Sequence, residues 1–265
     1  MNPSEIAAIL AELGASPAKS RGQNFLIDDR VADRQIEHAG LSPQDTVLEV
    51  GPGLGMLTGR LAAHAGKVIA IETDAKLASF LVGRLPENVE LIEGDALAVD
   101  FPPFDKFVSN LPYSISSPII FKLLEHRFEK GVVMLQKEFA DRMVALPGSD
   151  DYSRLTVNVY YRSECRILEK VPRSRFWPAP KVDSAVVELV PRPPPFEVED
   201  ERLFFRLVEM LFQNRRKKIG TVLRMRSLVT AEQKALLPYV DLRVEVLSPE
   251  QIGELSDRVA ELRAR

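Results

Sequence analysis

The segment Ser109-Asn110-Leu111-Pro112-Tyr113 holds the residues best suited to do chemistry. Asn110 offers a neutral amide oxygen, and Pro112 restricts Leu111 to an extended conformation that keeps nearby backbone carbonyls out of a helix. Tyr113 adds a flat aromatic face. A planar base with an exocyclic amine would find two hydrogen-bond acceptors and a stacking surface here. Acceptors placed in this way would localise the lone pair of the amine nitrogen and direct it at an electrophile.

Two apolar stretches place this segment at the end of a strand. Residues 104–108 predict a strand, and residues 115–124 predict a helix. The segment would therefore lie at the carboxyl end of a strand, where open α/β sheets bind their ligands. A turn capped by Asn110, with Tyr113 packed on it, fits the same residues. If stacking is the only role of Tyr113, its hydroxyl group is dispensable.

A glycine-rich turn follows the first strong strand pattern. Residues 46–50 predict that strand, Gly51, Gly53 and Gly55 alternate after it, and residues 56–64 have helical spacing. Such glycines let the backbone pass close to a ligand, and the helix start supplies free N–H groups. The spacing is not the G-x-G-x-x-G of dinucleotide-binding proteins. It therefore favours a nucleotide or nucleoside cofactor without a bound pyrophosphate.

Carboxylates mark two further strand ends. Residues 67–71 predict a strand ending at Glu72, 21 positions after Gly51, where an acid can accept hydrogen bonds from ribose hydroxyls. Residues 89–92 predict another strand, and Asp95 follows it, able to accept from an adenine amine. Each feature alone fits a tight turn, a strand-terminal charge or a helix cap. In order and at βαβ spacing they predict a pocket for S-adenosylmethionine (SAM), and hence methyl transfer.

The composition indicates a globular protein of one large domain, or of a large and a small one. The chain has 265 residues, 45% of them hydrophobic, and a net charge of -3. Cys165 is the only cysteine, which excludes an internal disulfide and is typical of a small buried side chain in a reducing cytosol. The three histidines are far apart, so we expect no metal site. Without an apolar run of membrane-spanning length or a signal peptide, we expect a cytoplasmic protein and no membrane contact.

The remaining patterns predict a mixed sheet followed by helices. Further strands are expected at residues 131–136, 155–162, 165–171 and 185–190. Helices are expected at residues 5–13, 29–39, 138–146, 201–212, 215–224, 231–238 and 249–262. The proline-rich stretch 191–195 is a stiff linker. We therefore predict an α/β, Rossmann-like methyltransferase domain with a seven-stranded mixed sheet (residues 1–190) and a small all-α C-terminal domain (residues 191–265).

Two stretches outside the glycine and asparagine motifs indicate contact with RNA. Residues 213–226 contain six cations and no acid, in a chain that is otherwise acidic; Arg215, Arg216, Lys217 and Lys218 are consecutive. A solvated helix end would explain the run, but phosphate contacts are favoured. Phe176 lies among cations, aromatics and prolines, either in a rigid loop or as a stacking face for an extruded base.

Four stretches resemble the KsgA-type ribosomal RNA adenine dimethyltransferases. They are residues 22–26, 49–55, 110–113 and 176–185. The similarity extends over nearly the whole chain, and residues 116–118 and 135–139 are most similar to the archaeal and eukaryotic branch. The resemblance implies a monomer that transfers two methyl groups from SAM to N6 of each of two adjacent adenosines. These adenosines lie in a hairpin loop near the 3′ end of small-subunit ribosomal RNA, in the pre-30S particle.

The resemblance also implies roles for individual residues. The implied SAM contacts are Asn24, Leu26, Gly51 with Gly53 in the glycine turn, Glu72 on the ribose, Asp95 on the adenine, and Asn110. The target base would be held by Asn110 and Leu111 and stacked between Tyr113 and Phe176. Ser114 stands where many members have Asn, and Ser109 where some have Gly. Neither difference removes an acceptor or the stacking ring.

Two alternative functions stay open. An Erm-type methyltransferase acts on adenine N6 of large-subunit (23S) ribosomal RNA and shares the SAM site, although residues 212–218 favour the small-subunit enzyme. The chain could also act mainly as a ribosome-assembly factor that checks the subunit by binding, with its chemistry secondary.

Overall fold

The computed structural model describes residues 1–15 and 24–264. Gly22 and Gln23, which open one of the family-like stretches, lie outside the described residues. The chain forms two compact units: Met1–Ala140 with Glu164–Pro191, and Asp141–Ser163 with Arg192–Arg265. The chain thus leaves the first unit at Pro191, near the predicted linker. Residues 141–163, however, which the sequence analysis assigned to the first domain, belong to the second unit.

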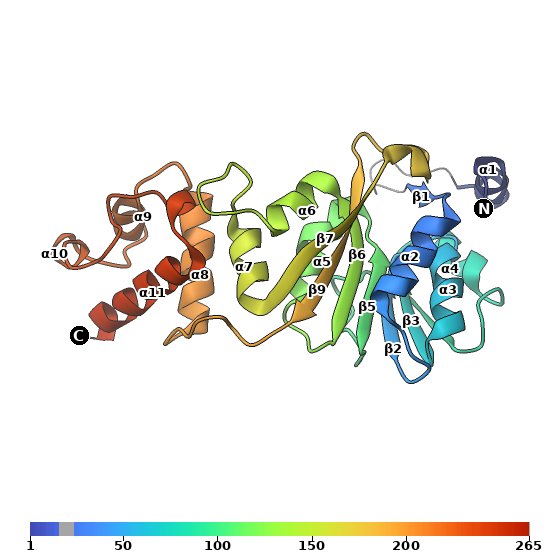
Figure 1. The fold of residues 1–265 in the computed structure, drawn as a ribbon, viewed down its shortest axis with the longest axis horizontal. Helices are drawn as coiled ribbons and strands as arrows, with labels where there is room; N and C mark the ends of the chain where they lie inside the picture. The colour runs from blue at the N-terminus through green and yellow to red at the C-terminus, as the bar shows by residue number, and fades with distance from the viewer. Residues whose placement is uncertain (16–23, 265) are drawn as a thin grey trace. The chain divides into compact units, whose positions relative to one another are not determined.

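The first unit is built on a seven-stranded mixed sheet with strand order β4-β3-β2-β5-β6-β9-β7 (Figure 1). The strands are β2 (Thr46–Val50), β3 (Lys67–Glu72), β4 (Val89–Glu93), β5 (Lys106–Asn110), β6 (Lys130–Gln136), β7 (Ser163–Val171) and β9 (Ser184–Pro191). The five neighbouring strands β4, β3, β2, β5 and β6 are parallel, and β9 runs antiparallel to β6. A separate two-stranded ribbon joins β1 (Phe25–Leu26) to β8 (Phe176–Trp177).

Helices accompany the sheet and bury apolar faces that their sequences prescribe. They are α1 (Pro3–Glu12), α2 (Asp29–Ala39), α3 (Met56–His64), α4 (Ala75–Leu81), α5 (Ser116–Leu123) and α6 (Lys137–Met143). Helix α2 is capped by Asp28, whose side chain accepts the N–H of Arg30, and it buries Val31 and Ile36. These side chains join Leu61 of α3 in one core against the sheet. Helices α2 and α3 therefore lie on the same face of the sheet (Figure 1).

The sheet opens between β2 and β5, where the strand order reverses. Strand β2 pairs with β3 over five residues but with β5 only at Val47 and Leu48. Beyond this point the hydroxyl of Ser109 donates to the carbonyl of Val50 at 2.6 Å. At the carboxyl ends of β2 and β5, a side-chain hydrogen bond thus takes the place of the backbone hydrogen bonds between the strands. A reversal of strand order is where doubly wound sheets form their ligand crevices.

The second unit is helical. It contains α7 (Arg154–Arg162), α8 (Glu201–Gln213), α9 (Ile219–Met225), α10 (Ala231–Lys234) and α11 (Pro249–Ala264). Tyr161 of α7 lies at the centre of its core, with its ring centroid 5.1 to 5.4 Å from those of Phe196, Phe204 and Phe205. In the part of the chain that the structure describes, no helix is both long and apolar enough to cross a membrane.

Several elements differ from the sequence prediction; helix α10, for example, ends at Lys234 instead of residue 238. Residues 155–162, predicted as a strand, form helix α7, whose residues are buried on nearly all sides. The alternation was misleading because the polar Thr156 and Asn158 stand between Leu155, Val157 and Val159, although all five side chains are buried in the helix. Helix α9 starts at Ile219 instead of residue 215, so that Arg215 to Lys218 lie in the turn after α8.

Candidate functional site

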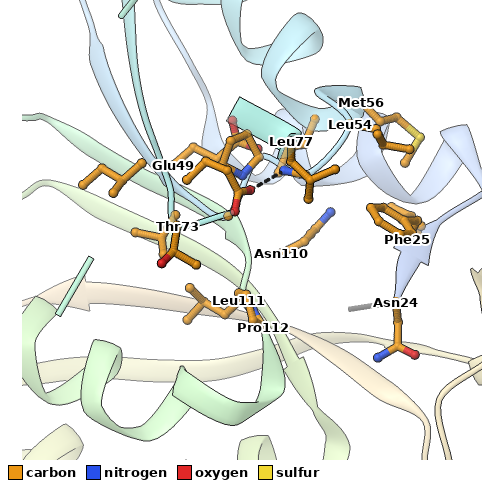
Figure 2. A pocket seen from close by; sticks show the side chains of 18 of the residues that line it. Asn24, Phe25, Glu49, Leu54, Met56, Thr73, Leu77, Asn110, Leu111 and Pro112 are labelled. Carbon is orange, nitrogen blue, oxygen red and sulfur yellow. Dashed lines mark hydrogen bonds between the residues drawn. The ribbon is translucent and has the colours of Figure 1, made fainter. Parts of the chain in front are cut away.

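A cavity of about 340 Å³ lies in the first unit, where the carboxyl ends of the parallel strands meet (Figure 2). The structure brings to it every residue predicted for the cofactor or the target base. These residues are Asn24, Leu26, Gly51, Gly53, Glu72, Asp95, Asn110, Leu111, Tyr113 and Phe176. The four predicted RNA-binding cations are not among its lining residues and belong to the second unit.

The glycine turn packs directly on the proline of the Asn-Leu-Pro-Tyr segment. Gly51 and Gly53 have φ of 75° and 61°, in the left-handed region that other residues rarely adopt. A Cβ atom on Gly51 would lie 3.2 Å from Cδ and Cγ of Pro112. The two motifs are therefore in van der Waals contact, and glycine is needed both for the backbone conformation and for the close approach.

Glu72 holds the glycine turn in place from the end of β3. One carboxylate oxygen accepts the N–H of Gly53 at 3.1 Å, and the other accepts the N–H of Asp74 at 2.9 Å. Burial raises the pKa of the Glu72 carboxyl above its ordinary value, although these bonds and one from the backbone of Thr73 act to lower it. Because a carboxylate can accept about four hydrogen bonds, the group keeps acceptor capacity for a ligand.

Asp95 lies at the rim of the cavity in a braced loop. Its side chain is exposed and accepts the N–H of Leu97 at 2.9 Å, and its carbonyl accepts the N–H groups of Ala98 and Val99. Lys122 of α5 donates to the carbonyl of Ala96 at 2.9 Å. The loop that carries the Asp95 carboxylate is thus fixed from two sides.

Asn110, the last residue of β5, projects into the space beside Leu77 and Phe25 (Figure 2). Its amide oxygen is buried and, among the described residues, has no hydrogen-bond partner. A buried acceptor left in this state costs about 1 to 3 kcal/mol. The position therefore indicates a place where a ligand donates an N–H group.

Of the two backbone carbonyls at Leu111 and Pro112, predicted to be free acceptors, only one is free among the described residues. The carbonyl of Pro112 is occupied, because it accepts the N–H of Ile115 at 3.1 Å and the hydroxyl of Ser116 at 3.2 Å. The carbonyl of Leu111 receives no hydrogen bond from the described part of the chain. The available acceptors are therefore the amide oxygen of Asn110 and the carbonyl of Leu111.

The two aromatic residues come from different elements. Tyr113 follows β5 in a short 3-10 turn, is half-buried and lines the cavity. Phe176 of β8 is 5% exposed and is the cross-strand partner of Leu26 in β1. Arg175 strengthens this ribbon by an ion pair with Asp28 at 2.9 Å. The ribbon thus joins Leu26, a predicted cofactor residue, to Phe176, a predicted base-stacking residue.

The comparisons with known proteins agree with this arrangement. The family model described as ribosomal RNA adenine dimethylase matches residues 15–261. The chain belongs to the ribosomal RNA adenine dimethylase family. The family membership expected from the four motif stretches is therefore confirmed.

Relatives in this family match nearly the whole chain. A protein of Methanosarcina acetivorans named probable ribosomal RNA small subunit methyltransferase A is 52% identical over 252 residues, covering 92% of this chain and 94% of the relative. One of the same name from Thermococcus gammatolerans is 45% identical over 256 residues, covering 94% and 91%.

Two solved structures share the fold. A dimethyladenosine transferase from Plasmodium falciparum has a TM-score of 0.73 at 32% identity, covering 87% of this chain and 95% of that chain. The 23S rRNA methyltransferase ErmE has a TM-score of 0.64 at 34% identity, covering 89% and 100%. The predicted Rossmann-like fold with a mixed sheet and a helical C-terminal part is confirmed.

Glu49 is a lining residue to which the sequence analysis gave no role. It is 1% exposed, and one of its carboxylate oxygens has no partner in the described chain. Burial raises the pKa of Glu49 to about 8, and the neighbouring Glu72 adds to the rise. An acid inside the otherwise apolar strand of residues 46–50 was the signal that could have revealed it. At neutral pH this family member therefore carries a mostly protonated Glu49.

The four predicted RNA-binding cations differ in how far they are engaged by the protein itself. The guanidinium of Arg215 donates to Glu245 at 2.8 Å and to the carbonyls of Asp150 and Ser149 at 2.7 and 3.1 Å. It therefore ties parts of the second unit together. Arg216, Lys217 and Lys218 are exposed, and Lys218 pairs with Asp241 at 3.3 Å.

The described residues contain no candidate metal site. Among residues 1–15 and 24–264, no three His, Cys, Asp or Glu side chains are grouped so that they could hold an ion.

Glu49→Gln should change how stability depends on pH. Glu49 keeps its proton in the folded state up to about pH 8, whereas in the unfolded chain it ionises near 4.5. Between these values the unfolded state binds fewer protons, so the free energy of unfolding falls with rising pH by up to about 1.4 kcal/mol per unit. Urea unfolding of the protein without SAM from pH 5 to 8.5 should show a smaller fall for Glu49→Gln than for the wild type.

Glu37→Gln is the matched control, because Glu37 is an exposed carboxylate on α2. This variant should keep the wild-type slope. Parallel slopes for the wild type and Glu49→Gln would show that Glu49 is ionised in the folded protein.

Proposed function

We propose that this chain transfers methyl groups from SAM to N6 of two adjacent adenosines in a hairpin loop of small-subunit ribosomal RNA. The orphaned amide oxygen of Asn110 carries the proposal, because it is an unpaired acceptor on a cavity lined by the motifs of the family. The names of the two archaeal relatives support the small subunit as the source of the RNA. The proposal includes a role in subunit biogenesis, as a cytoplasmic monomer that acts on the pre-30S particle.

The residues around the cavity fit SAM as the cofactor. The Gly51 and Gly53 backbone allows close approach, the Glu72 carboxylate keeps acceptor capacity for ribose hydroxyls, and the Asp95 carboxylate can accept from an adenine amine. Asn24 and Leu26 line the same cavity from the side of β1. SAM supplies an electrophilic methyl group when bound.

The protein's part in the reaction is to bind and orient the amine. The amide oxygen of Asn110 and the carbonyl of Leu111 accept the two N–H groups of N6, so that its lone pair is no longer delocalised into the purine ring. Tyr113 and Phe176 stack on the base and keep water away. Precise placement of two reactants contributes on the order of 7 to 11 kcal/mol to lowering such barriers. The proton of the methylated amine leaves to solvent after the bond has formed.

The second unit is proposed to bind the RNA backbone through its exposed cations. Arg216, Lys217 and Lys218 stand on the turn before α9, with their side chains in solvent. Arg215 is left out of this role, because three hydrogen bonds within the unit engage its guanidinium.

Asn110→Ala tests the proposal most directly. With naked small-subunit RNA or pre-30S particles and SAM, mass spectrometry of the RNA should show methylated adenosines for the wild type. The variant should be slower by about 100-fold or more, since it lacks the acceptor that orients the amine. Asn110→Asp keeps an acceptor oxygen and should be less impaired.

Each result of this experiment separates the alternatives. With naked large-subunit RNA offered in a parallel reaction, methylation of that RNA instead would support the Erm-type function, to which the likeness with ErmE points. An Asn110→Ala protein that binds particles normally would show that binding and chemistry are separable roles. Wild-type rates in Asn110→Ala would refute the mechanism.

Glu72→Gln should weaken SAM binding measured by calorimetry. The loss of the negative charge beside the ribose should cost about 1 to 3 kcal/mol, or roughly 5- to 150-fold in affinity. Glu93→Gln is the control, because Glu93 pairs with Glu72 across the neighbouring strand but is exposed and does not line the cavity. Equal SAM affinity in the two variants would contradict the role of Glu72.

Replacing Arg216 and Lys217 by alanine should weaken binding of small-subunit RNA without changing the thermal midpoint. The slope of log affinity against log salt should fall by about 1 for each phosphate that the variant no longer neutralises.

Arg215→Ala should instead lower the thermal midpoint, because Glu245 and two carbonyls lose their donor. Arg127→Ala removes an exposed cation before β6 and serves as the control. An equal loss of RNA affinity in that control would mean that only net charge matters.

A further inference from the structure

The hydroxyl group of Tyr113 is bonded to a serine in another strand. Its oxygen lies 2.6 Å from Oγ of Ser184, the first residue of β9. Ser184 is fully buried and stands opposite Gln136 of β6. The bond therefore links the turn after β5 to a strand two positions away in the sheet.

Ser184 is a fixed point of the sheet. Strand β9 pairs with β6 over six residues, from Leu189 to Ser184. The preceding residue, Asp183, is held by its carbonyl, which accepts the N–H of Lys137 at 2.9 Å. Its carboxylate accepts the N–H of Arg173 at 3.0 Å and pairs with Lys170 at 2.9 Å. The serine oxygen thus has a place that does not depend on Tyr113.

Tyr113 is held less firmly by its own backbone. It begins a 3-10 turn of three residues, Tyr113–Ile115, that has no side-chain cap. Its ring lines the cavity and is only half-buried. Burial raises the pKa of the phenol, so the group stays a neutral O–H at the pH of the cell. A ring used only for stacking needs no hydroxyl, and a buried hydroxyl costs stability unless it is bonded.

We propose that the bond to Ser184 fixes the plane of the Tyr113 ring, and that Ser184 is a positioning residue for methyl transfer. The inference rests on the proposed function, in which the target base stacks on this ring. A ring that can tilt holds the amine in line with the methyl group for a smaller share of the time, so the rate falls while the SAM site is unchanged. This assigns a role to the serine of the stretch 176–185, and it makes the Tyr113 hydroxyl necessary.

The test is a double-mutant cycle with Tyr113→Phe and Ser184→Ala. Single-turnover methylation of small-subunit RNA should slow by roughly tenfold in each single variant. The double variant should be no slower than the slower single variant, because both changes remove the same bond. SAM affinity by calorimetry should stay within about twofold of wild type, since neither side chain is assigned to the cofactor.

Ser163→Ala is the matched control. Ser163 is also a buried serine at the start of a strand, β7, but its hydroxyl donates to the carbonyl of Val159. At a temperature where all the proteins are folded, this control should keep the wild-type rate. If Ser184→Ala does not fold, the rate and SAM affinity of Tyr113→Phe decide alone.

Three results would overturn the inference. They are a wild-type rate in Tyr113→Phe, single effects that multiply in the double variant, and SAM affinity that falls in step with the rate. In each of them the wild-type enzyme methylates its RNA, so the proposed function stands. A wild-type protein that methylates no ribosomal RNA would overturn both.

Discussion

The separation of β2 from β5 is the feature on which the site depends. Parallel strands that stay paired to their ends leave no room between their side chains, and here the ladder stops after Leu48. The hydroxyl of Ser109 donates to the carbonyl of Val50, so this carbonyl stays paired although the ladder has stopped. The glycine turn and Asn110 are both placed by the ends of these two strands. A bulky residue at 51 would press on Pro112 and disturb both sides at once.

The cavity is lined by two buried carboxyl groups that are stabilised in different ways. Glu72 has hydrogen bonds from two backbone N–H groups, which favour its charged form against the cost of burial. One carboxylate oxygen of Glu49 has no partner among the described residues. The pKa of this group is raised by burial, so the carboxyl avoids a buried negative charge by keeping its proton. A site of this kind is suited to a ligand with positive charge, because such a ligand would stabilise the ionised acids that burial disfavours.

Much of the fold follows from local patterns, and the failures have physical causes. Strand β2 and helix α3 have the predicted bounds, since an apolar β-branched run ending in glycines has few alternatives. Asn110 and Tyr113 were found because their chemistry is rare at a strand end. The burial of Glu49 and the hydrogen-bond partners of Arg215 could not be predicted, because both are decided by distant segments of the chain. Residues 155–162 gave a false period because the polar Thr156 and Asn158 alternate with apolar residues and are nevertheless buried in the helix.

The chain crosses between the two compact units at three places, not one. Residues 141–163 leave the first unit between β6 and β7 and complete the core of the second, where Tyr152 and Tyr161 pack on Phe212 and Phe204. A truncation at Pro191 would therefore not liberate an intact catalytic fragment. It would remove Phe204 and Phe212, so that Tyr152 and Tyr161 of residues 141–163 would be exposed to water. The helical portion is assembled from two separate stretches of sequence, so gene-level shuffling of this domain would need two junctions in addition to the one at the proline linker.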